Sequence, residues 1–76
     1  MEKQEIKKSL RRLLDGYYVY SEEYQDKYYL LKDIKETLPQ LDESKIMDAI
    51  NYANVAVAPP RKIRKFIKAF VYKIDT

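Results

Sequence analysis

The chain has 76 residues, a net charge of +3 from 15 lysines and arginines against 12 aspartates and glutamates, and neither cysteine nor histidine. This length allows one domain over residues 1–76, and the missing cysteines and histidines exclude a disulfide scaffold and the usual structural zinc sites. Without histidine and cysteine, the chain lacks the commonest catalytic base and the most nucleophilic side chain. A single glycine leaves no glycine-rich loop that could bind phosphate. We therefore expect a non-enzymatic protein without a cofactor.

The first predicted helix covers residues 3–14. One apolar stripe at helical spacing is formed by Ile6, Leu10, Leu13 and Leu14. Gly16 follows at the position of a left-handed C-terminal cap, which glycine adopts without a steric penalty. The N-terminal residues lack the apolar run of a signal peptide, and no stretch of the sequence could span a bilayer, so we expect a soluble, cytoplasmic protein.

Residues 17–20 are rich in strand-forming side chains, but the rest of the chain offers no strong partner strand, so we expect an extended connection. A second helix is predicted from its N-cap candidate Ser21 to about Thr37, because Pro39 disfavours helical geometry in the residue before it. The apolar face of this helix is expected to contain Tyr24, Tyr28, Leu30, Leu31, Ile34 and Leu38.

Asp42 is the predicted N-cap of a third helix, and Leu41 and Ile46 occupy the two positions of a hydrophobic staple around its first turn. The buried face of this helix is expected to contain Ile46, Ala49, Ile50 and Ala53. Asn54 is expected to close the helix in a left-handed conformation, and residues 55–58 to form a short apolar loop.

Pro60 suits the first turn of a fourth helix, where its missing N–H costs nothing. The most regular apolar series in the chain follows it: Ile63, Phe66, Ile67, Phe70 and Ile74. Four amphipathic helices with short connections predict a compact all-α bundle. The alternative is a three-helix core with a short β-element near residues 17–20.

Charge is distributed unevenly along the chain. Residues 21–45 carry seven acidic and four basic side chains, and the outer face of the second helix is expected to hold Tyr29 among Glu22, Asp26, Asp33 and Glu36. Residues 58–74, by contrast, carry six basic side chains and no acidic one. Within them Arg61 with Lys65, and Arg64 with Lys68, are like-charged neighbours at helical spacing, which repel. Tolerance of this repulsion indicates an anionic partner.

Nucleic acid is the partner that this charge predicts. The candidate contact residues are Arg61, Arg64, Lys65, Lys68, Lys8 and Arg11. The third and fourth predicted helices have the outline of a helix-turn-helix, but Pro59 and Pro60 fall where its second helix should already be under way. Nonspecific binding, in which the protein contacts only phosphates, requires the basic side chains but no helix-turn-helix.

A protein-binding module, such as an inhibitor, immunity or adaptor protein, is the alternative. Tyrosine is enriched at interfaces, and Tyr29 and Tyr72 are expected to project away from the apolar stripes of their helices. A second copy of the chain could occupy such faces as well. A membrane-surface role for the fourth helix is disfavoured, because removing Phe66, Ile67 and Phe70 from the core would leave too little apolar surface to fold the rest.

Overall fold

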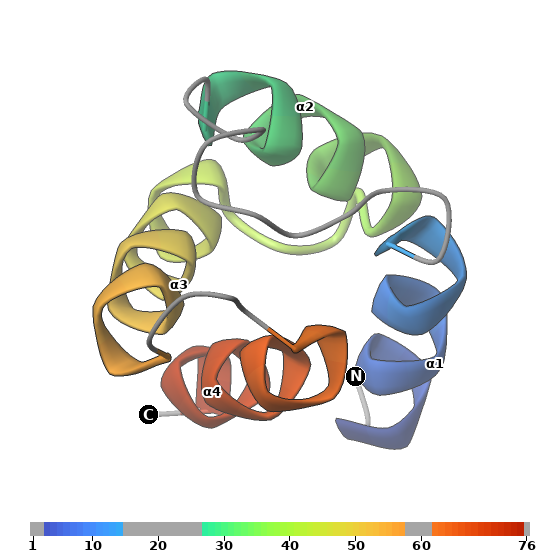
Figure 1. Ribbon diagram of the computed structural model, residues 1–76. Helices are drawn as coiled ribbons and strands as arrows, with labels where there is room; N and C mark the ends of the chain where they lie inside the picture. Colours follow the sequence, from blue (N-terminus) through green and yellow to red (C-terminus); the bar gives the residue numbers. More distant parts are fainter. Residues whose placement is uncertain (1–2, 15–26, 58–61, 76) are drawn as a thin grey trace.

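A computed structural model describes residues 3–14, 27–57 and 62–75 of the chain. These residues form four α-helices: α1 (Lys3–Leu14), α2 (Lys27–Thr37), α3 (Glu43–Ala56) and α4 (Ile63–Asp75). Figure 1 shows the helices as a ring in which each lies beside its neighbour in sequence and α4 returns to α1. The predicted all-α bundle is confirmed for the described residues, while the alternative β-element at residues 17–20 lies outside them.

The hydrophobic core fills the inside of this ring. It is a single cluster of buried side chains: Ile6, Leu10, Leu14, Leu30, Ile34, Leu38, Ile46, Ala49, Ile50, Ala53, Phe66, Ile67, Phe70 and Val71. Every helix contributes one face to the cluster, as expected for amphipathic helices that have no other apolar surface to pack against. The sequence prediction omitted Val71, which lies next to Phe70 and is 2% exposed.

The first and last helices follow their predicted apolar stripes. The bounds of α1 match the prediction, while α4 begins at Ile63. The carbonyl of Lys62 accepts the N–H of Phe66 at 3.0 Å, which places Lys62 at the N-terminal boundary of the helix. The predicted helix start at Pro60 and the predicted cap at Gly16 lie outside the described residues.

The tyrosine predicted for the apolar face of α2 is not buried. Tyr28 is 66% exposed, whereas Leu30 and Ile34 are almost fully buried. Tyr28 and Ile34 are six positions apart in the sequence, so their side chains point about 120° apart around the helix axis, too far for both to face the core. The helix ends at Thr37 as predicted, while its predicted start at Ser21 and the neighbouring Tyr24 fall outside the described residues.

The third helix starts as predicted and ends later. The carbonyl of Asp42 accepts the first helical N–H, from Ile46, at 3.0 Å, and its carboxylate accepts the Ser44 hydroxyl at 2.5 Å in place of a backbone N–H. The predicted cap at Asn54 is wrong, because Asn54 lies inside the helix. Ala53 and Val57 are buried one helical turn apart, and the helix continues to Ala56 before the extended backbone of Val57 ends it.

A lysine holds the turn between α2 and α3. The Lys35 ammonium donates hydrogen bonds to the carbonyl oxygens of Pro39 at 2.9 Å and Leu41 at 2.6 Å. These carbonyls follow the end of α2, where backbone acceptors have no helical partner, so the ammonium acts as a C-terminal cap. Lys35 therefore has a structural role that sets it apart from the exposed cations of the molecule.

Replacing Lys35 by methionine should lower the free energy of unfolding by about 1–2 kcal/mol, because the aliphatic stem remains while two charge-assisted hydrogen bonds are lost. Chemical denaturation followed by circular dichroism measures this change. Lys32→Met is the matched control, because Lys32 is exposed on the same helix. An equal loss in both variants would contradict a specific role of Lys35 in the turn.

Candidate functional site

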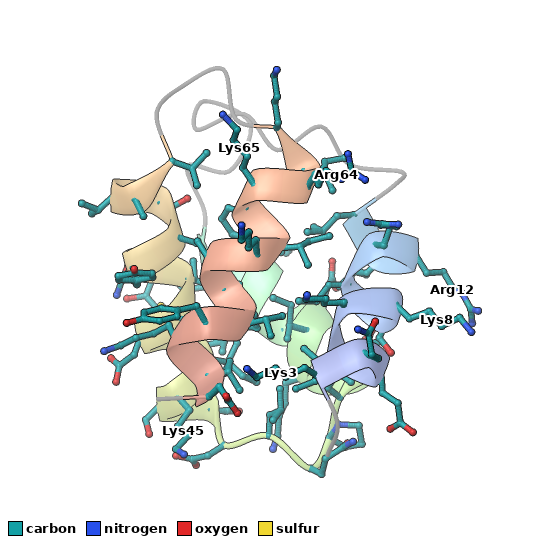
Figure 2. The ribbon with its side chains drawn as sticks, turned by 90° about the horizontal axis from the view of Figure 1, so that it is seen from below. Lys3, Lys8, Arg12, Lys45, Arg64 and Lys65 are labelled. Atoms are coloured by element: carbon teal, nitrogen blue, oxygen red, sulfur yellow. The ribbon has the colours of Figure 1, made fainter. Side chains whose placement is uncertain are left out.

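The outward side of α4 carries a line of exposed side chains, Lys65, Lys68 and Tyr72. They recur three and four residues apart and so share one face of the helix. The opposite face holds Phe66 and Phe70, both 0% exposed, with ring centroids 6.5 Å apart. Burial of this face fixes the rotation of α4, and that rotation turns Lys65, Lys68 and Tyr72 toward solvent. Figure 2 looks directly at this side of α4.

Positive charge on α4 is concentrated and poorly balanced. From residue 62 to residue 75 the basic side chains are Lys62, Arg64, Lys65, Lys68 and Lys73. Asp75, at the end of the helix, is the one acidic residue in that range, and the first helical turn has none. The positive end of the helix dipole lies at the same first turn as Arg64 and Lys65, so both cations sit where the helix disfavours them.

The carboxylate of Asp75 is paired with the other end of the described chain. Its Oδ2 atom lies 2.9 Å from Nζ of Lys3, and both side chains are more than half exposed. Among the described residues no carboxylate lies within 4 Å of Arg64, Lys65 or Lys68. The cations in the middle and at the start of α4 therefore remain available to an anion from outside.

The structure brings the two basic helices together. α1 packs directly against α4, and Figure 2 shows Arg64 extending from α4 to the side on which α1 lies, while Lys8 and Arg12 point away from α4. Lys8 and Arg11, the candidates predicted on α1, line one shallow hollow of about 290 Å³ together with Gln4 and Lys7. Two neighbouring helices, α1 and α4, thus both carry basic side chains outside the core.

We use the name cationic surface for eight basic residues of α1 and of the start and middle of α4, all of them exposed except Lys7, which is half-buried. Its members are Lys7, Lys8, Arg11, Arg12, Lys62, Arg64, Lys65 and Lys68. Five of the six residues predicted from sequence belong to it, and the sixth, Arg61, lies outside the described residues. Lys8 and Arg12 also line a second hollow of about 270 Å³, which α1 shares with the turn after α2.

Two tyrosines lie at the edge of the cationic surface. The rings of Tyr72 on α4 and Tyr52 on α3 have centroids 5.8 Å apart and planes tilted by 30°. Nζ of Lys73 lies 6.0 Å from the centroid of the Tyr52 ring, on the same side of the molecule. Tyr72 is 59% exposed and Tyr52 38%. The sequence pattern predicted Tyr72 as an exposed tyrosine but not Tyr52. The contact of Tyr52 with Tyr72 depends on α3 lying beside α4, which the sequence pattern does not show.

The second predicted tyrosine lies elsewhere. Tyr29 is 66% exposed on α2, which lies across the helical ring from α4 (Figure 1). The expected acidic face around Tyr29 is only partly described, because Glu22 and Asp26 lie outside the described residues. The described part of α2 combines Asp33 and Glu36 with three lysines.

The connection between α3 and α4 differs from a helix-turn-helix. Six residues, 57–62, separate the two helices, whereas that motif joins its helices by a turn of about 3–4 residues. This difference agrees with the expectation drawn from Pro59 and Pro60. On α4 the cationic surface extends from Lys62 at the N-terminal boundary to Lys68 in the middle of the helix, rather than being confined to the first turn.

Residues 3–14, 27–57 and 62–75 contain no group of three acidic side chains arranged to hold a metal ion. None of the helices in these ranges combines the length and apolarity that a membrane-spanning segment requires. No protein-family model, curated protein or solved structure matches the chain.

Proposed function

We propose that this protein is a non-enzymatic nucleic-acid-binding protein that holds phosphates with its cationic surface. The observation that carries the proposal is the set of exposed cations on α4, Arg64, Lys65 and Lys68, which have no carboxylate within 4 Å among the described residues. Arg64 and Lys65 lie at the positive end of the helix dipole, and Lys68 lies one turn from Arg64, and both arrangements cost stability. A polyanion removes this cost on binding, and nucleic acid supplies phosphates at regular spacing along its backbone.

Binding to DNA should be strong at low salt and fall steeply as salt rises. A protein that neutralises about four to six phosphates releases a similar number of counterions, so its affinity should drop by about 100- to 1000-fold between ~50 and ~200 mM salt. Fluorescence anisotropy of a labelled DNA oligonucleotide across a salt series measures both the affinity and the slope. Absence of binding at the lowest salt, or binding that salt does not change, would reject the proposal.

A protein partner is the second candidate. It is favoured by Tyr28 and Tyr29, which lie side by side in sequence on α2 and are each 66% exposed. These two tyrosines lie on the helix across the ring from α4 (Figure 1). The two candidate functions therefore use different parts of the surface, and variants of Tyr29 serve as controls for binding through α4.

A further inference from the structure

We infer that the α4 part of the cationic surface selects single-stranded over duplex nucleic acid, with one base stacked on Tyr72. This inference rests on the proposed function and goes beyond it, because phosphate contacts alone would not distinguish the two forms. Two independent features carry it: the position of Tyr72 in the line of cations, and the position of α4 between two other helices.

Tyr72 continues the line of exposed cations on α4. It follows Lys68 by four residues, which is about 6 Å along the helix axis. One extended nucleotide spans that distance, so a strand whose phosphates lie on Lys65 and Lys68 would bring its next base to the tyrosine ring. A basic track next to an exposed aromatic ring is the arrangement by which proteins hold single strands without sequence preference.

Tyr52 supports the ring that would receive the base. The 5.8 Å separation and 30° tilt of the two rings correspond to an offset aromatic pair, and Tyr72 keeps 59% of its surface exposed in this pair. The tyrosine is therefore positioned before any ligand arrives, and less conformational entropy is lost on stacking than for an isolated side chain.

The neighbours of α4 restrict its access to a duplex groove. The major groove is about 12 Å wide and admits one helix, and a single helix with its side chains already has a diameter of about 10–12 Å. α4 packs against α1 on one flank and α3 on the other, and Figure 2 shows it between them on the exposed side. α1 and α3 limit how deeply α4 could enter a groove, so this surface would contact a duplex mainly through its backbone.

The experiment compares an oligothymidylate strand with the duplex that it forms with its complement, by fluorescence anisotropy at low salt. The intact protein should bind the single strand more tightly. Tyr72→Ala should weaken single-strand binding by about 5- to 100-fold and leave duplex binding and the salt slope unchanged. Tyr72→Phe should retain the affinity, because it keeps the ring.

Tyr29→Ala is the matched control, because Tyr29 is exposed to a similar extent on the helix across the ring from α4. This variant should bind like the intact protein. An abasic strand with the same number of phosphates tests the inference without any protein variant, and it should lose affinity to the same extent as Tyr72→Ala does.

Equal affinity of the intact protein for strand and duplex, or full affinity for the abasic strand, would overturn the inference and leave the proposed function standing. Failure to bind either form at low salt would instead reject the proposed function. A preference for the single strand that survives Tyr72→Ala would place the stacked base elsewhere and so contradict the role of Tyr72.

Discussion

Replacing Lys65 and Lys68 together by glutamate should weaken binding to DNA by about 100-fold or more at ~50 mM salt, because each phosphate contact contributes about tenfold at that salt. Both side chains are exposed on the outward face of α4. The salt slope should become shallower at the same time, since fewer counterions are released. Anisotropy titrations across a salt series measure both quantities on one set of samples.

The matched control is the double reversal Lys32→Glu with Lys45→Glu. This control changes the net charge by the same amount, and both of its lysines are exposed. Lys45 also matches Lys65 in helix position, because each is the third residue of its helix. Figure 2 shows Lys45 and Lys65 at opposite ends of the molecule. We expect a much smaller loss of affinity in this control. An equal loss would show that binding follows the total charge and that α4 has no special part in it.

The stability of the Lys65→Glu, Lys68→Glu variant gives a second readout. Glutamate at residue 65 places negative charge in the first turn of α4, where the helix dipole favours it and where no acidic residue is found in the natural sequence. Its free energy of unfolding should therefore not fall below that of the unaltered protein, although binding is lost. A marked destabilisation would mean that these lysines have a structural role.

Truncating Phe70 to alanine should lower the free energy of unfolding by about 3–5 kcal/mol, through lost burial and the cavity left in the core. Phe70 is 0% exposed and lies beside Phe66, which is also 0% exposed. A domain of this size has a total stability of about 4–11 kcal/mol, so this one change removes much of it. Chemical denaturation followed by circular dichroism measures the loss.

Phe70→Leu is the companion variant, because it keeps most of the apolar volume and should cost far less. A loss close to zero for Phe70→Ala would show that α4 does not anchor the core. The rotation of α4 would then be undetermined, and the outward position of Lys65 and Lys68 would lose its physical basis.

The spacing of apolar residues was sufficient to predict the position and the buried face of an individual helix. The stripe around Leu10 placed α1 within its observed bounds, and the series through Phe66 and Phe70 identified the buried face of α4. The exposed cations of α4 followed directly, because a helix that buries one face must present the other. The prediction that Tyr28 belongs to the apolar face of α2 was wrong. Tyrosine counts as apolar in a sequence pattern, but the angular position of Tyr28 around the helix axis directs its side chain away from the core.

Relations between helices could not be derived in this way. Nothing in the local pattern of α1 indicates that it packs against α4, and the Lys3–Asp75 pair joins residues from opposite ends of the described chain. Tyr52 was missed for the same reason, because it becomes part of the site only when α3 lies beside α4. The late end of α3 at Ala56 depends on burial of Val57, which is a property of the assembled core.

The closure of the helical ring has a consequence for how the molecule assembles. Contacts between α3 and α4 require only a short loop to close, whereas those between α1 and α4 enclose most of the polypeptide. The entropy lost on closing a loop grows with its length, and distant contacts slow folding. The junction of α1 and α4 thus carries the largest closure penalty of all the helix pairs. A chain in which only α3 and α4 have paired still lacks the α1 half of the cationic surface.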